Sequence, residues 1–248
     1  MRRLLLLLTA PLAPVLTVVL ALVLALGLVP AGPAAATATS GGTVTLDGVT
    51  VRLRSGTRQV VTVNRTTGYH ARVTFWTFGD AGWHAAFRAT DGRVGYGGLV
   101  VAGDRVQGSG TTPLGTFSLP WAFGTRAPRA AWTDAGYRRV RAGDYWVLDN
   151  RSRFYNRYRN KSDGGFRWRL PASDPNSSER LADYPQQYEY AVVTGFNAVQ
   201  VRHRGGAIFL HVNGRGATAG CVSAPRWFLR RATDALDEGR VPVIAIGR

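Results

Sequence analysis

The stretch IFLHVNGRGATAGCVS, residues 208–223, is the part of the chain from which the fold and the chemistry are best predicted. Its apolar beginning predicts a buried strand that ends at His211. The glycines that follow predict a flexible loop. This loop leads to Cys221, the only cysteine of the chain. A thiol that follows an imidazole through a glycine-rich loop is typical of an activated cysteine nucleophile.

The segments after this stretch predict one helix and one strand. Residues 226–236 have the pattern of a surface helix, with Pro225 in its first turn and Gly239 at its end. Residues 241–246 are apolar on both faces, which predicts a central strand. We expect Cys221 to lie close to the helix N-terminus, where backbone N–H groups and the helix dipole would lower the pKa of its thiol.

The chain before this stretch predicts a mainly β protein. Turn residues separate short segments rich in β-branched and aromatic side chains, at a spacing of roughly 8–12 residues that is typical of a sandwich or a barrel. We expect strands within residues 44–53, 59–63, 71–78, 83–87, 144–148, 188–196 and 207–212.

The N-terminal residues predict export. Arg2 and Arg3 precede an apolar run over residues 4–29, and small residues follow it, the pattern of a secretory signal. The length of the run leaves a membrane anchor open as the alternative to cleavage. We therefore expect residues 1–36 to be a signal peptide or an N-terminal membrane anchor, residues 37–57 a linker and leading segment, and residues 58–248 the main domain.

The charge of the chain favours anionic partners. The formal charge is +16, and +14 without residues 1–36, and the basic residues are almost all arginines. For an exported protein, such a charge indicates cell-wall polymers and anionic lipids rather than nucleic acid. Because the arginines are dispersed, the charge serving only solubility stays an alternative. Residues 151–169 mix arginines with aromatic side chains, which we interpret as packing against the core and not as a single-strand-binding surface.

The expected roles around Cys221 follow from its neighbours. Gly220 allows backbone N–H groups near Cys221 and Val222 to point at a developing oxyanion. His211 is the candidate general base, and a backbone carbonyl would orient its ring because no carboxylate lies nearby in the sequence. The alternative is structural: a satisfied core histidine and a cysteine that acts as a small buried apolar residue. No metal-ligand cluster is present in the sequence.

A second glycine-rich segment lies upstream. Residues 101–119 contain Gly103, Gly108, Gly110 and Gly115 around Thr-Thr-Pro. Such a density of glycine allows the backbone to approach a ligand closely, although an ordinary surface loop has the same composition.

Together these residues resemble a known signature. His211 followed by Thr218, Gly220, Cys221 and Val222 looks like the active-site motif of the L,D-transpeptidase catalytic domain family (YkuD-like). In that motif a histidine at a strand end precedes Ser/Thr-His-Gly-Cys, one apolar residue, and Arg or Asn. The segment GTTPLGTF, residues 110–117, is similar to the Thr-Pro-x-Gly-x-Phe segment of the family. The resemblance covers roughly residues 59–247, so residues 58–248 would be the catalytic domain.

The sequence departs from the signature in its substrate-binding positions. Ala219 replaces the histidine before Gly-Cys, Ser223 stands where Arg or Asn is usual, and the loop after His211 is shorter. These departures concern the recognition of a substrate carboxylate more than the nucleophilic chemistry. We expect Arg226 or Arg215 to supply a cation instead, since arginine suits carboxylates. Thr218 and Ser223 complete the expected substrate-binding set.

The resemblance implies a mixed β-sandwich with few short helices and an acyl-transfer mechanism. Cys221 would form a thioester with a peptidoglycan stem peptide, and His211 would move the protons. Neither a metal nor an organic cofactor is implied. An L,D-carboxypeptidase of the same fold and a non-catalytic basic protein that binds the cell wall remain alternatives. The sequence does not address the oligomeric state.

Overall fold

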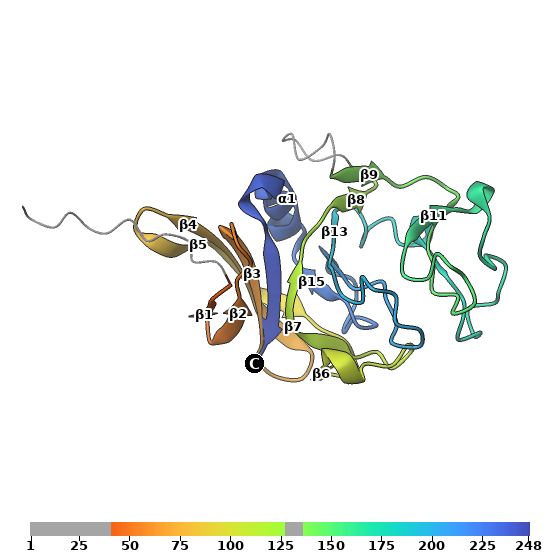
Figure 1. Cartoon of the computed structure of the whole chain (residues 1–248), viewed down its shortest axis with the longest axis horizontal. Coiled ribbons are helices and arrows are strands. Elements are labelled where there is room, and N and C mark those ends of the chain that lie inside the picture. Colours follow the sequence, from red (N-terminus) through yellow and green to blue (C-terminus); the bar gives the residue numbers. More distant parts are fainter. Residues whose placement is uncertain (1–40, 127–135) are drawn as a thin grey trace, which may run out of the picture. The chain divides into compact units, whose positions relative to one another are not determined.

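Strands make up most of the regular structure in the computed structural model, which describes residues 41–126 and 136–248 (Figure 1). All of them belong to one unit that spans Ala35–Arg248. The expected signal or anchor segment, residues 1–36, lies outside the described residues. Among those that are described, no helix combines the length and the apolar character that a membrane span requires.

The described residues form one large mixed sheet of 11 strands. In sheet order these are β6 (Leu99–Val101), β7 (Thr112–Ser118), β16 (Val243–Gly247), β3 (Gln59–Arg65), β4 (His70–Gly79), β5 (Gly82–Arg93), β15 (Val222–Ala224), β14 (Phe209–Val212), β13 (Ala191–Val193), β8 (Ala122–Gly124) and β9 (Tyr137–Arg139). The predicted C-terminal strand is indeed central, since β16 runs parallel to β3 and antiparallel to β7.

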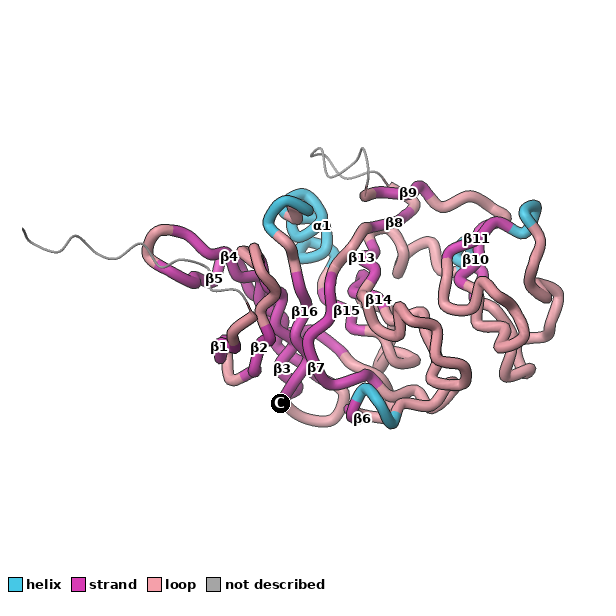
Figure 2. Tube along the Cα trace, viewed as in Figure 1, coloured by secondary structure: helices cyan, strands magenta, loops and turns pink. Residues whose placement is uncertain are grey.

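The two halves of this sheet share one core. A single residue pair, Ser223 with Arg93, joins β15 to β5 and so connects the two halves. Phe75 from the first half and Leu210 and Val222 from the second half lie in the same hydrophobic cluster. Burial of these faces against one another is the main stabilising term of a sandwich. The prediction of a mainly β, mixed sandwich-like fold with few short helices is confirmed (Figure 2).

Helix α1 (Arg226–Ala235) closes one end of this core, with Phe228 in contact with Phe87 at a ring-centroid distance of 5.0 Å. The helix ends at Ala235 with Leu236 as its C-cap, close to the predicted end at residue 236, and Gly239, which was expected to end it, lies beyond it in the 3-10 turn η4 (Glu238–Arg240). The buried side chain of Gln59 explains the difference: it donates to the Ala235 carbonyl at 2.8 Å and accepts from the Asp237 N–H at 2.9 Å. These bonds replace a further helical turn.

The first predicted strand segment is a hairpin. Residues 44–53 divide into β1 (Thr43–Leu46) and β2 (Val49–Arg52), joined by Asp47 and Gly48 at φ angles of 53° and 78°. Two consecutive positive φ angles are the signature of the tight hairpin turn that Asp-Gly favours. Val49 and Val51 then pack against the β16 side of the sheet.

A second layer covers the outer face of β13 and β14. Its three-stranded sheet consists of β11 (Tyr158–Asn160), β10 (Asp144–Trp146) and β12 (Glu179–Arg180), and its 3-10 turns are η2 (Lys161–Asp163) and η3 (Leu181–Asp183). Trp146 packs on Phe209 at 4.8 Å between ring centroids. Trp146, Phe209 and Cys221 belong to one hydrophobic cluster, so the side chain of Cys221 lies between the large sheet and the second layer.

The arginine-rich part of the second layer packs as the sequence predicts. Phe154 lies beneath the guanidinium group of Arg159, 3.5 Å from the ring centroid, and Trp168 lies beneath that of Arg169 at 4.5 Å. The aromatic rings are therefore covered by the arginines of their own segment. Phe166 is also buried in a cluster with Tyr145 and Val147, against which Phe154 and Trp168 pack.

Candidate active site

A cavity of about 660 Å³ lies where the second layer meets the Cys221 loop. Cys221 and His211 line it from the large sheet, Glu179 and Tyr188 from the second layer, and Arg105 from the upstream glycine-rich segment. The glycine-rich segment includes β6, the 3-10 turn η1 (Ala102–Asp104) and β7. Three segments that are far apart in the sequence thus supply the titratable groups of one cavity.

The thiol of Cys221 lies immediately before β15 and not at the helix N-terminus. It donates to the Ala207 carbonyl at 3.0 Å and accepts from the Phe209 N–H at 3.4 Å. Burial, with a smaller contribution from the negative charge of Glu179, raises the pKa of Cys221 to about 12. The predicted lowering of this pKa by the helix dipole is wrong, because the strand Val222–Ala224 separates the thiol from α1.

The imidazole of His211 is neutral and held in one tautomer. His211 lies in β14 and is 7% exposed, and burial lowers its pKa to about 4. Its Nδ1 lies 2.8 Å from the Val212 carbonyl oxygen. Only a protonated Nδ1 can bond to a carbonyl, so Nε2 is the unprotonated nitrogen. The orienting group is therefore a backbone carbonyl, as the sequence predicts.

Cys221 and His211 share the cavity without a direct hydrogen bond in the described part of the chain. The thiol bonds of Cys221 go to the backbone of β14 and of the residues before it. The ring of His211 instead stands edge-on to the ring of Tyr188, at 5.5 Å between centroids. The thiol proton of Cys221 is therefore directed at the Ala207 carbonyl and not at the ring of His211.

The carboxyl group of Glu179 is the member of the site that the sequence did not reveal. Glu179 lies in β12 and accepts a hydrogen bond from the Tyr188 hydroxyl. Burial raises the pKa of Glu179 to about 7, and burial together with the charge of Glu179 raises the pKa of Tyr188 well above its usual range. No motif surrounds Glu179 in the sequence, since the second layer brings it to the cavity only in the folded chain.

The two predicted motifs meet through threonine hydroxyls. Thr112 accepts from the Gly95 N–H at 2.8 Å and donates to the carbonyls of Gly220, at 2.8 Å, and Cys221, at 3.3 Å. Thr218 donates to the same Cys221 carbonyl at 2.6 Å. The backbone that carries the thiol is therefore fixed from both sides, which is the precision that a nucleophile needs.

Gly220 is required by a close approach of the upstream segment. Its φ is +129°, and a Cβ atom there would lie 2.8 Å from Nη2 of Arg105 and 2.9 Å from the Thr111 carbonyl oxygen. The dense glycines thus allow a close approach of backbone to the Cys221 loop. The expectation from composition was an approach to a ligand.

The structure places four of the predicted site residues at the cavity. Cys221, His211, Thr218 and Arg215 all line it. Arg215 is exposed on the loop between β14 and β15.

The other predicted positions do not line the cavity. Ser223 is fully buried. It lies opposite Arg93 in the sheet, and its hydroxyl donates to the Asn213 side chain at 2.7 Å. Arg226 lies on α1 and pairs with Glu189 at 2.5 Å. Val222 points its side chain into the main core. Of the predicted substrate-binding positions, Ser223 and Arg226 are therefore not brought to the thiol.

Comparisons with known proteins place the chain far from characterised sequences. No protein-family model matches it. No curated protein matches it either. Among solved structures it is similar to an L,D-transpeptidase from Mycobacterium smegmatis, with 12% sequence identity and a TM-score of 0.35, over 85% of this chain and 69% of that chain. At that TM-score the likeness carries no argument about function.

Proposed function

We propose that the protein is an exported, cysteine-dependent L,D-transpeptidase that acts on peptidoglycan stem peptides. Cys221 is the nucleophile and His211 the base. The observation that carries the proposal is the tautomer of His211: its Nδ1–H donates to the Val212 carbonyl, which leaves Nε2 free to accept a proton in the cavity that contains the thiol. The sequence motifs and the N-terminal segment support the substrate class and the location at the outer face of the cytoplasmic membrane or in the cell wall.

In this mechanism a neutral thiol reacts with the help of a neutral imidazole. Sγ of Cys221 attacks the carbonyl carbon between an L-centre and a D-centre of the donor stem, and the thiol proton passes to Nε2 of His211. The carbon–nitrogen bond then breaks. Its electron pair stays with nitrogen, which takes the proton from His211, and the terminal D-residue leaves as the free amino acid.

The second half of the reaction releases the thioester. An amine of a neighbouring stem attacks the thioester carbonyl and gives its proton to His211. The carbon–sulfur bond breaks, and Sγ recovers the proton as a thiol. The product is a cross-link when the acceptor is an amine. When the acceptor is water, the same steps give L,D-carboxypeptidase activity, and analysis of the products for a cross-linked dimer separates the two.

The test uses donor stem peptide with and without an acceptor amine. Cys221→Ala and His211→Gln are expected to abolish release of the terminal D-residue. His84→Gln is the matched histidine control, because His84 is exposed on β5 and bonds to Thr77, far in sequence from the motif. Activity that survives in folded Cys221→Ala protein would sink the proposal.

A second function, non-catalytic binding to the cell wall, is favoured by one observation. A thiol whose pKa is raised to about 12 is almost entirely protonated at neutral pH, and the charge of the chain suits anionic wall polymers. This function predicts salt-sensitive binding to isolated walls together with a Cys221 that resists alkylation. The transpeptidase proposal predicts a thiol that reacts with alkylating reagents.

A further inference from the structure

The guanidinium group of Arg105 is the one buried cation in the described lining of the cavity. Arg105 is 5% exposed. Its Nε donates to the Thr111 carbonyl at 2.8 Å, and its Nη1 donates to the Arg204 carbonyl at 2.9 Å. The group also lies over the ring of Phe196, at 5.5 Å from the centroid. These contacts fix the plane of the guanidinium without neutralising its charge.

The third nitrogen of Arg105 lies next to the thiol loop. A Cβ atom at Gly220 would be 2.8 Å from Nη2, so this nitrogen borders the residue that precedes Cys221. Nη2 makes no hydrogen bond to any described residue, whereas Nε and Nη1 each make one. The positive charge of Arg105 also lowers the pKa of Cys221, against the larger effect of burial.

The acidic groups of the cavity do not neutralise Arg105. Glu179 bonds to the hydroxyl of Tyr188, and Asp183 pairs with Arg180 at 3.2 Å. Within the described residues, no ion pair includes Arg105. A buried charge without a counter-ion costs free energy, and burial accordingly lowers the pKa of Arg105. Such a cost is offset when a ligand supplies the anion.

We propose that Arg105 is the anion-binding residue of the site and that its Nη2 binds a carboxylate oxygen of a peptide substrate beside Cys221. The identity of the substrate as a peptide rests on the proposed function. The role is the one for which the sequence offered Arg226 and Arg215. Arg226 is occupied by Glu189, and Arg215 is exposed on the loop. Among the described arginines of the cavity, Arg105 alone combines burial, a fixed plane and a nitrogen without a hydrogen bond next to Gly220, the residue before Cys221.

The experiment compares two alkylating reagents of similar size, anionic iodoacetate and neutral iodoacetamide, by intact mass against time. The ratio of their rates at Cys221, relative to the ratio for free cysteine, reports an anion-binding group beside the thiol. Arg105→Gln is expected to lower this ratio by at least about tenfold, the size of one charge-assisted hydrogen bond. Arg180→Gln is the matched control, because it removes the same charge from the exposed rim, where Arg180 bonds to Ala142 and Asp183.

Two further measurements keep the test valid if Arg105→Gln fails to fold, one on Arg105→Lys and one on the unmodified protein. The lysine variant keeps the charge and should retain part of the ratio. In the unmodified protein, N-acetyl-D-alanine should slow the reaction with iodoacetamide, whereas N-acetyl-D-alaninamide should not. A ratio that is unchanged in Arg105→Gln, or equal protection by the acid and the amide, overturns the proposal.

An inert thiol would be a separate result. If neither reagent modifies Cys221 in the folded protein, the proposed transpeptidase function fails. Calorimetric titration of the same protein with N-acetyl-D-alanine and with its amide then tests Arg105 by itself. Binding of the acid that is lost in Arg105→Gln would support anion binding, and equal binding of both compounds would contradict it.

Discussion

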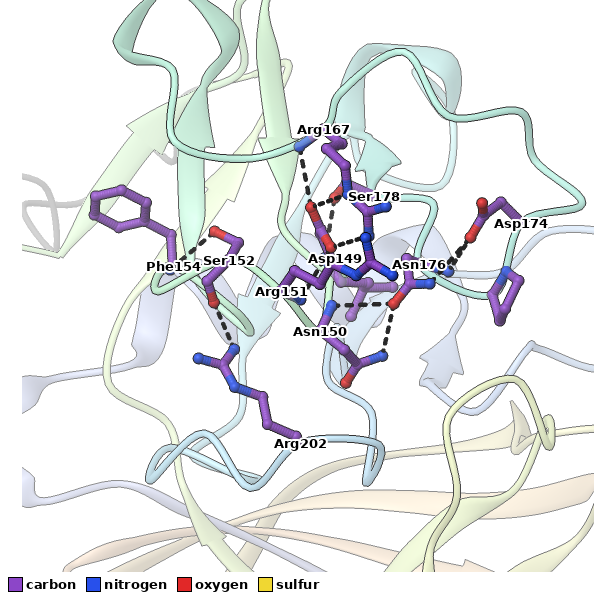
Figure 3. Close-up of polar contacts among 12 residues, drawn as sticks. Asp149, Asn150, Arg151, Ser152, Phe154, Arg167, Asp174, Asn176, Ser178 and Arg202 are labelled. Atoms are coloured by element: carbon purple, nitrogen blue, oxygen red, sulfur yellow. Dashed lines mark hydrogen bonds and ion pairs between the residues drawn. The ribbon is translucent and has the colours of Figure 1, made fainter.

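Two carboxyl groups of the second layer, Asp149 and Glu179, have opposite surroundings. Asp149 is 1% exposed and accepts four hydrogen bonds, from the N–H groups of Arg151 and Arg167 and from two nitrogens of the Arg167 side chain (Figure 3). The bonds to Arg167 lower the pKa of Asp149 to about 2. Glu179 has one hydroxyl partner, Tyr188, and burial raises its pKa to about 7.

The difference separates a structural carboxylate from a site carboxyl. The Asp149 charge is matched by donors within its own segment, as is usual for a buried group that holds a loop together. Glu179 borders a cavity in which a thiol, an imidazole and a guanidinium also lie outside their usual pKa ranges. Groups with displaced pKa values gather at functional sites more often than elsewhere. The second layer therefore uses Asp149 for its own stability and brings Glu179 to the site.

The largest expected effect is a loss of activity at the cavity, on replacement of Cys221. Cys221→Ser should lower the rate of acyl transfer by on the order of 10⁴-fold or more, because the hydroxyl is a far weaker nucleophile here. The free energy of unfolding should change by less than about 1 kcal/mol, since the two side chains are close in size. Release of the terminal D-residue and urea unfolding measure the two quantities. A large loss of stability with little loss of rate would mean that Cys221 is a structural residue and not the nucleophile.

Asp149→Asn should have the next largest effect, and on stability alone. The change breaks the two-pronged pair with Arg167 and should lower the free energy of unfolding by about 1–2 kcal/mol, a value reduced because Arg167 is 38% exposed. Chemical denaturation checks it. Asp163→Asn, an exposed carboxylate of the same layer, is the control.

The same variant should also lose an acid-dependent part of stability. The pKa of Asp149 is depressed to about 2 in the folded chain, below an unfolded value of about 3.9. Its contribution is therefore complete above about pH 4 and is lost as the pH falls toward 2. A stability profile over that window should be flatter for Asp149→Asn than for the unmodified protein. Parallel profiles would contradict the assigned pKa.

Glu179→Gln should raise the reactivity of Cys221, whereas the variants above lower activity or stability. Without the charge of Glu179, the pKa of Cys221 falls, and the rate of alkylation by iodoacetamide near pH 8 should rise by about threefold to tenfold. Asp183→Asn removes a charge from the exposed rim and should change the rate less. A slower reaction in Glu179→Gln would show that the carboxyl group assists the thiol.

The pH dependence of stability gives Glu179 a second test. Its pKa is raised to about 7 in the folded chain from about 4.3 when unfolded, so the folded state binds more protons between these values. Stability should therefore fall as the pH rises from about 4 to 7, and the Gln variant should lack this fall. The contribution of His211 to stability rises with pH below about pH 6.5, because its pKa is lowered on folding. The profile of the unmodified protein is therefore compared with that of Glu179→Gln, in which His211 is still present.

The smallest effect is expected at an exposed ion pair. Arg226, whose side chain is 49% exposed, pairs with the partly buried carboxylate of Glu189, and Arg126 lies 2.9 Å from the same carboxylate. Arg226→Gln should change the free energy of unfolding less than Asp149→Asn does, because water screens the exposed guanidinium group and Arg126 still pairs with Glu189. If Arg226→Gln and Asp149→Asn lower the free energy of unfolding equally in urea, the larger contribution assigned to the Asp149 pair is contradicted.

Local patterns were enough to predict the strands and the motif residues. The apolar C-terminal run predicts the central strand, and the density of glycine predicts that the backbone of residues 101–119 approaches a neighbour closely. What local patterns miss is set by contacts between distant segments. Gln59 ends the helix about 180 residues later in the chain. The helix begins at Arg226 as predicted, but the strand Val222–Ala224 separates its N-terminus from Cys221.

The missing site residues have the same cause. Glu179 lies in no motif, and Arg105 lies in the glycine-rich segment without being predicted, because each reaches the site only when its segment packs against the Cys221 loop. Ser223 is predicted from its position in the family signature, and Arg226 as a cation that would suit a substrate carboxylate. A parallel strand pair and a helix instead turn both side chains away from the cavity.

The most direct test of the central claim is the intact mass of the protein after incubation with a carbapenem. If Cys221 is a nucleophile that His211 assists, one covalent adduct should form, peptide mapping should place it on Cys221, and His211→Gln should form it much more slowly. The absence of an adduct on protein whose fold is confirmed by circular dichroism would contradict the account.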